Sequence, residues 1–144
     1  MQQTEDIAVF TRDGGVSIYF PQMTKRDKPI KSGGMVQSES AASIGYKALK
    51  KTYKEKQPVT LIQFDKIRRG SLHPCQKPVA LLEYLIKTYT LEGETVLDNC
   101  MGSGSTGIAC LNTNREFIGM EKEDKYYEIA CKRIEDARKE GTLL

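Results

Sequence analysis

A glycine-rich turn close to residue 100 carries the residues of this chain that are best suited to bind a ligand. An apolar run ends at Asp98, and Gly102, Gly104 and Gly107 follow before a helix-forming stretch. Gly102 and Gly104 lack a Cβ atom, so the backbone can adopt positive φ and approach a ligand closely. Unpaired N–H groups at the start of the next helix would point at the same ligand. A strand, a turn and a helix in this order are typical of sites that hold an adenosine-containing ligand at the tip of a parallel sheet.

A second acidic residue lies at the spacing that a nucleotide site requires. Residues 117–120 form another apolar strand pattern, and Glu121 follows it directly. In nucleotide-binding sheets, an acid about 20 residues after the turn accepts hydrogen bonds from the ribose hydroxyls. The motif does not distinguish a dinucleotide from S-adenosylmethionine, because both contain a ribose and an adenine. A tight turn that binds no ligand is a third interpretation of the glycines.

Hydrophobic periodicity predicts the elements that must position this turn. The apolar residues between Leu81 and Ile86 would form one face of a helix that begins near Pro78. Residues 24–45 follow no regular period and are predicted to form a long basic loop. The expected helices cover residues 78–89, 105–111 and 124–139, and the expected strands cover residues 5–11, 59–64, 96–99 and 117–121.

Charge is unevenly distributed along the 144 residues. The net charge is +3, but residues 24–77 hold 13 Lys and Arg against 4 Asp and Glu. This basic middle favours a polyanion such as nucleic acid, although a solvated lysine-rich surface has the same composition. The four cysteines form no C-x-x-C pair, so we expect no zinc site and reduced thiols in a cytoplasmic protein. No apolar run approaches the roughly 20 residues that span a bilayer, so we expect no membrane partner.

Three motifs follow one another from residue 73 in an order that resembles a known enzyme family. Residues 73–78 read H-P-C-Q-K-P, residues 98–106 read D-N-C-M-G-S-G-S-T, and residues 117–121 read F-I-G-M-E. They resemble the H-P-x-Q-K-P element, the D-P-F-x-G-S-G-T-T cofactor loop and the next strand of DNA amino-methyltransferases, which methylate adenine N6 or cytosine N4. The motif order resembles the circularly permuted β class of that family, strongly over residues 73–135 and weakly before them.

The resemblance implies an α/β fold, with part of a Rossmann-like methyltransferase sheet, flanking helices and a basic, irregular target-recognition region. Residues 1–23 would supply an amino-terminal strand region of the sheet, residues 24–70 the target-recognition region, and residues 71–144 the S-adenosylmethionine-binding half-domain. The partner would be double-stranded DNA, methylated on the amino group of adenine in preference to cytosine. A dehydrogenase is disfavoured, because a dinucleotide site gives no role to residues 73–78 or to the basic region.

Cofactor contacts also follow from the resemblance. Asp98 would accept a hydrogen bond from the α-ammonium group, Glu121 would accept the ribose hydroxyls, and Lys77 would pair with the cofactor carboxylate. Asn99 replaces the proline of the family loop and Cys100 replaces its phenylalanine, so we expect a looser pocket. The implied cofactor-binding residues are Gln76, Lys77, Pro78, Asp98, Cys100, Gly102, Ser103, Gly104, Ser105, Thr106, Glu121 and Lys122.

The basic residues of the middle region are the implied DNA contacts. His73, the only histidine, is expected to order its turn through hydrogen bonds, with acid–base work as the alternative. No pattern indicates metal ligands, so no metal is expected. The implied DNA-binding residues are Lys25, Arg26, Lys28, Lys31, Lys47, Lys50, Lys51, Arg68 and Arg69.

The largest departure from the family pattern is an absence. Family members carry a [D/N/S]-P-P-[Y/F/W] element that hydrogen-bonds the target amino group and stacks on the flipped base. No two of the five prolines here are adjacent. In the β class this element precedes the region where the present chain starts, so we expect no catalytic residue in it.

The missing catalytic element also predicts that another protein surface covers part of this chain. Without the strand that carries the catalytic element, residues 96–99 would expose an unpaired apolar edge, which proteins avoid. We therefore expect a partner subunit that carries the missing element, or a homodimer. A non-catalytic remnant that binds S-adenosylmethionine or DNA is the alternative, and an NAD-binding fragment is a lesser one.

Overall fold

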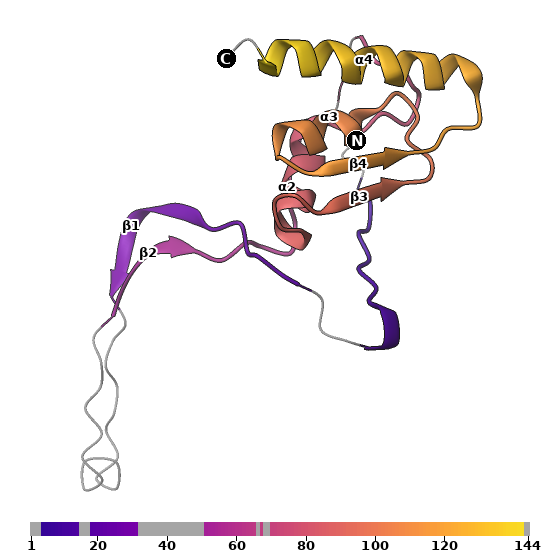
Figure 1. Cartoon of the computed structure of the whole chain (residues 1–144). Coiled ribbons are helices and arrows are strands. Elements are labelled where there is room, and N and C mark those ends of the chain that lie inside the picture. The colour runs from indigo at the N-terminus through magenta and orange to yellow at the C-terminus, as the bar shows by residue number, and fades with distance from the viewer. Residues whose placement is uncertain (1–3, 15–17, 32–50, 66, 68–69, 143–144) are drawn as a thin grey trace, which may run out of the picture. The chain divides into compact units, whose positions relative to one another are not determined.

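The computed structural model describes residues 4–14, 18–31, 51–65, 67 and 70–142 (Figure 1). It divides into two compact units, one of residues 21–62 and one that combines residues 1–20 with residues 63–144. The predicted division into residues 1–23, 24–70 and 71–144 stays a prediction. The elements in chain order are a 3-10 helix η1 (Arg12–Gly14), β1 (Thr24–Lys31), β2 (Thr52–Lys56), α2 (Val79–Tyr89), β3 (Thr95–Asp98), α3 (Ser105–Asn112), β4 (Glu116–Gly119) and α4 (Asp124–Thr142).

The larger unit contains a parallel strand pair joined by a helix. β3 and β4 pair in register from Thr95 opposite Glu116 to Asp98 opposite Gly119, and α3 connects them. This arrangement confirms the predicted α/β class. Because the two strands run in the same direction, their carboxyl ends meet at one edge of the sheet. The glycine-rich turn leaves that edge from β3, and Glu121 follows β4 at the same edge.

The core of this unit lies where α2, α3 and β4 meet. Ala109 and Cys110 of α3 are fully buried and pack with Ile86 of α2. Burial raises the pKa of the Cys110 thiol to about 11, so the thiol is neutral at physiological pH. Helices α2, α3 and α4 confirm the three predicted helices. Helix α2 begins at Val79, and Pro78 occupies its N-cap position.

The glycine-rich turn is packed tightly against α4. Gly104 has a φ of +78° and directly precedes α3. A Cβ atom at this position would lie 2.9 Å from the Cβ of Ala130 and 3.0 Å from its Cα. A side chain at residue 104 would therefore push α4 away from α3, whether or not a ligand is bound.

One face of the β3–β4 pair is apolar and exposed. Leu97 and Ile118 lie opposite each other in the pairing, and their exposed fractions are 60% and 52%. Among the described residues, β3 pairs only with β4. The other face of the pair, which carries Val96 and Phe117, packs against the core.

Two predicted strands and one predicted loop are wrong. Residues 5–11 and 59–64 form no strand, although both runs are rich in β-branched and aromatic residues. Phe10, for example, is 90% exposed. Strand propensity reflects packing on a pleated surface, and no described strand lies beside either run to provide one. Conversely, Thr24–Lys31 form β1 because β2 pairs with them, despite a composition that disfavours strands.

The smaller unit contains an antiparallel ribbon made by β1 and β2. The paired residues are Thr24 with Lys56, Lys25 with Glu55, Ile30 with Tyr53 and Lys31 with Thr52. The register shifts between Lys25 and Ile30, and Pro29 lies inside this irregular stretch, where its missing N–H is tolerated. None of the helices in the described parts of the chain is long and apolar enough to cross a membrane.

Replacement of Gly104 by alanine is expected to lower the free energy of unfolding. The added methyl group would collide with Ala130, and the backbone at residue 104 has a positive φ that alanine disfavours. Overpacking of this kind costs roughly 1–3 kcal/mol. Urea unfolding followed by circular dichroism measures the change.

Gly141→Ala is the matched control. A Cβ atom at Gly141 in α4 meets nothing within 4 Å, so the control should unfold at the same or a higher urea concentration. Equal stability of Gly104→Ala and the unaltered chain would show that close contact between α3 and α4 is not required.

Candidate functional site

The carboxylate of Asp98 organises the first half of the glycine-rich turn. Its Oδ1 accepts the backbone N–H of Cys100 at 3.0 Å, and its Oδ2 accepts the hydroxyl of Thr106 at 2.6 Å. The two bonds tie the end of β3 to the first turn of α3. Asp98 therefore fixes the shape of the turn before any ligand is considered.

Glu121 performs the same task from the end of β4. Its Oε2 accepts the backbone N–H of Gly102 at 2.9 Å, and its Oε1 accepts the N–H groups of Lys122 at 2.9 Å and Glu123 at 3.0 Å. The N–H of Glu123, followed by those of Gly102 and Lys122, lowers the pKa of Glu121 below its ordinary value. The carboxylate is consequently charged at neutral pH and joins β4 to the turn.

Backbone and side-chain bonds hold the rest of the turn. The N–H of Met101 donates to the carbonyl of Met120 at 3.0 Å. Arg133 of α4 donates from its guanidinium group to the carbonyl of Ser103. Arg133 was not among the predicted site residues, because its position in the sequence gave no signal that it reaches the turn.

The turn at residues 73–76 is closed by its own hydrogen bonds. The N–H of Cys75 donates to Nδ1 of His73 at 3.2 Å, and the N–H of Gln76 donates to the His73 carbonyl at 3.1 Å. The hydroxyl of Ser71 donates to the same carbonyl at 2.6 Å. Oε1 of Gln76 accepts the N–H of Leu72 at 2.9 Å. These bonds give His73 the ordering role that the sequence analysis favoured.

His73 also joins its turn to the glycine-rich turn. A Cβ atom at Gly102 would lie 3.4 Å from the imidazole ring. The His73 ring also meets the ring of Tyr126 of α4 edge to face, with 4.4 Å between the ring centroids. These contacts place His73 beside the turn that Asp98 and Glu121 order.

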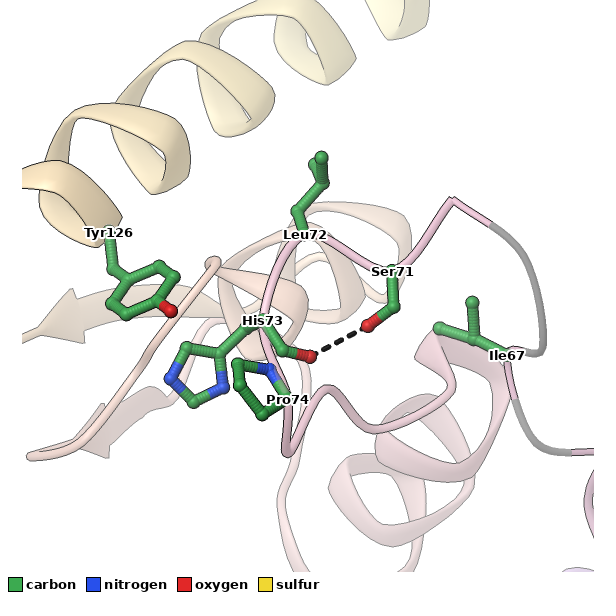
Figure 2. A pocket seen from close by; sticks show the side chains of 6 residues that line it. All are labelled: Ile67, Ser71, Leu72, His73, Pro74 and Tyr126. Atoms are coloured by element: carbon green, nitrogen blue, oxygen red, sulfur yellow. Dashed lines mark hydrogen bonds between the residues drawn. The ribbon is translucent and has the colours of Figure 1, made fainter.

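A hollow of about 400 Å³ lies beside these rings, and Figure 2 shows the side chains that line it. Its lining mixes apolar side chains with the polar side chains of Ser71, His73 and Tyr126, and the hollow is open to solvent. Tyr126 was not among the predicted site residues, because only the fold brings it to residues 71–74. The lining residues are Ile67, Ser71, Leu72, His73, Pro74 and Tyr126.

Lys77 already has a carboxylate partner within the chain. Its Nζ lies 2.5 Å from Oε2 of Glu5. Both side chains are substantially exposed, and an exposed ion pair contributes little stability, typically about 0–1 kcal/mol. The predicted pairing of Lys77 with the cofactor carboxylate stays a prediction, because the carboxylate that it contacts here belongs to Glu5.

The start of α3 offers unused hydrogen-bonding groups. Ser105 is only 5% exposed, and its hydroxyl has no hydrogen-bond partner among the described residues. The first N–H groups of any α-helix also lack partners within the helix. Ser105, Thr106 and the two ordering carboxylates therefore fit a polar ligand that carries both an amine and hydroxyl groups.

The remaining predicted site residues are distributed over both units. Lys25, Arg26, Lys28 and Lys31 lie on β1, and Lys51 directly precedes β2. Nε of Arg26 donates to the backbone carbonyl of Glu55 at 3.0 Å, so part of this guanidinium group joins β1 to β2. Lys47, Lys50, Arg68 and Arg69 lie outside the described residues. Within the described residues, no group of three or more His, Cys, Asp and Glu side chains could hold a metal ion.

Relatives among characterised proteins are restriction-system methyltransferases. The type II methyltransferase M.BglI of Bacillus subtilis is 45% identical over 69 residues, which are 48% of this chain and 20% of that protein. The type II methyltransferase M2.DpnII of Streptococcus pneumoniae is 48% identical over 63 residues, which are 44% of this chain and 24% of that protein. The matched region thus spans about a fifth to a quarter of the length of these relatives.

Solved structures give matches of similar extent. The crystal structure of the M1.HpyAVI–SAM complex is 42% identical, with a TM-score of 0.47, over 51% of this chain and 36% of that one. PvuII DNA methyltransferase, described as cytosine-N4-specific, is 22% identical, with a TM-score of 0.47, over 56% of this chain and 36% of that one.

A family model gives the broadest match. The N6/N4 methyltransferase model, described as DNA methylase, matches residues 2–132. The match covers the basic ribbon, the turn at residues 73–76, the glycine-rich turn and the first nine residues of α4. The chain therefore belongs to the N6/N4 DNA methylase family.

Proposed function

We propose that this chain is the cofactor-binding and target-recognition part of a methyltransferase that transfers a methyl group from S-adenosylmethionine to the exocyclic amino group of adenine or cytosine in DNA. The observation that carries the proposal is the glycine-rich turn between β3 and α3, ordered by the carboxylates of Asp98 and Glu121. Membership in the DNA methylase family supports the same reaction.

The methionine part of the cofactor would lie over this turn. Both Asp98 oxygens already accept one hydrogen bond each, and an ionised carboxylate offers about four acceptor sites. Asp98 can therefore order the turn and still accept from an α-ammonium group. The first N–H groups of α3 would receive the cofactor carboxylate. Lys77 would add a charge-assisted bond by exchanging Glu5 for that carboxylate.

The ribose would lie beside Glu121. Within the described parts of the chain, its Oε2 accepts only the N–H of Gly102, so this oxygen retains a lone pair for a ribose hydroxyl. The lowered pKa keeps Glu121 ionised and therefore able to accept at neutral pH. Glu121 would thus hold the turn and the cofactor with the same carboxylate.

Catalysis would require a group that these 144 residues do not contain. A DNA methyltransferase must extrude its target base and hold it by stacking and by hydrogen bonds. The adjacent prolines and aromatic residue that do this in the family are missing from the sequence. The exposed Leu97 and Ile118 face supports a partner subunit or a second copy that covers the strand pair, since large exposed apolar patches mark interaction sites.

Asp98→Ala and Glu121→Ala are expected to weaken binding of S-adenosylmethionine. Each removes a charged hydrogen-bond acceptor, and such bonds are worth roughly 1.5–3 kcal/mol, or about tenfold to a hundredfold in affinity. Calorimetric titration of the cofactor into the purified chain measures the loss. Titration of NAD into the same chain tests the dinucleotide alternative.

Two further variants separate ligand contact from turn disruption. Thr106→Val removes the bond from Thr106 to Asp98 but keeps the carboxylate, so it should retain more affinity than Asp98→Ala. Glu116→Ala removes an exposed acid at the opposite end of β4 and should bind like the unaltered chain. Unchanged affinity in both test variants would contradict the proposed contacts, and binding of NAD alone would contradict the cofactor. An unaltered chain that binds DNA but no S-adenosylmethionine would favour a non-catalytic remnant.

The purified chain alone is expected not to methylate DNA. The reason is the missing base-holding element, and the measurement is transfer of a tritiated methyl group from S-adenosylmethionine to duplex DNA. An active DNA adenine methyltransferase assayed in parallel provides the positive control. Incorporation above the no-enzyme background would reveal a catalytic element that the known motifs do not identify.

A further inference from the structure

The pairing of β1 with β2 sorts the side chains of the ribbon onto two different faces. Directly opposed residues in an antiparallel pair share a face, and alternate residues along a strand return to it. Thr24 lies opposite Lys56, and Lys31 lies opposite Thr52. Lys54 stands between Thr52 and Lys56 at the alternate position of β2. One face, which we call the lysine face, therefore carries Lys31, Lys54 and Lys56 with two threonines.

The opposite face has a different chemistry. It carries Ile30 opposite Tyr53 and Lys25 opposite Glu55. Nζ of Lys51 lies 5.6 Å from the centroid of the Tyr53 ring. This face therefore combines an apolar pair with an acid opposite a lysine, whereas the paired residues of the lysine face include no acid.

The lysine face matches the demands of a duplex. All residues of β2, and Thr24 and Lys31 of β1, are exposed. Lysine ammonium groups and threonine hydroxyls are common donors to phosphate oxygens. A two-stranded antiparallel ribbon is also narrow enough to enter the major groove of B-form DNA. A face with three cations and two hydroxyls can meet phosphates without burying an acid against them.

We infer that the ribbon binds the phosphate backbone of double-stranded DNA through the lysine face of Lys31, Lys54 and Lys56. The inference rests on the proposed function, which makes DNA the partner. It adds Lys54 and Lys56 to the predicted contacts and moves Lys25 and Lys51 to the face turned away from the phosphates. Arg26 stays at the register shift, where its Nε bonds the Glu55 carbonyl.

Salt-dependent binding of the full chain to a duplex tests this face. The measurement is fluorescence anisotropy of a labelled mixed-sequence duplex at several sodium chloride concentrations. The double variant Lys54→Gln, Lys56→Gln is expected to bind more weakly and to flatten the plot of log affinity against log salt by about 0.9 per lost contact.

The matched control is Lys25→Gln, Lys51→Gln, which removes the same charge from the opposite face and should leave the slope unchanged. The double variant Lys54→Arg, Lys56→Arg keeps both charges and should show the slope of the unaltered chain. This result would show that the glutamine variant lost charge and not its fold. A full slope in the Lys54 and Lys56 glutamine variant, with a reduced slope in the control, would overturn the face assignment alone. Absence of any duplex binding by the unaltered chain would overturn this inference together with DNA as the partner.

Discussion

The glycine-rich turn depends on two carboxylates that lie at the ends of adjacent parallel strands. The N–H groups of a turn lack the acceptors that a helix or a sheet would supply, and buried N–H groups are costly unless they are paired. Asp98 accepts the N–H of Cys100, and Glu121 accepts the N–H of Gly102. Parallel pairing of β3 with β4 brings both acids to the same edge, so the order of the turn follows from the sheet. In the proposed function the same two acids would accept hydrogen bonds from the cofactor, which would link fold and binding in one pair of residues.

The helices add a second constraint on this turn. Gly104 admits Ala130 of α4 at a distance that no side chain would permit, and Arg133 of the same helix holds the Ser103 carbonyl. The His73 ring lies next to Gly102 and contacts the ring of Tyr126 edge to face. The turn is thus held by contacts with both α4 and the segment that precedes α2. This explains how a segment 25 or more residues upstream can help to form the same site.

Local patterns predicted the larger unit well and the smaller one poorly. The helices after Pro78, Gly104 and Glu123, and the strands that end near Asp98 and Gly119, carry strong periodicity and sharp glycine or proline boundaries. β1 has no such signal, because its strand character comes from pairing with β2 more than 20 residues away. The run at residues 5–11 shows the reverse case, with suitable residues but no described neighbouring strand. Arg133 and Tyr126 reach the site only through the approach of α4, which no local pattern contains.

The central claim is that the turn ordered by Asp98 and Glu121 is a preformed site for S-adenosylmethionine. Titration of the isotope-labelled chain with the cofactor, followed through backbone amide resonances, tests it most directly. If the cofactor binds at the turn, the resonance shifts should concentrate at Gly102, Ser105 and Thr106, and the amides of β2 should not change. Resonance shifts confined to residues outside the turn would contradict a cofactor site at the turn. Unaltered amide resonances of these three residues at saturating cofactor would also contradict it.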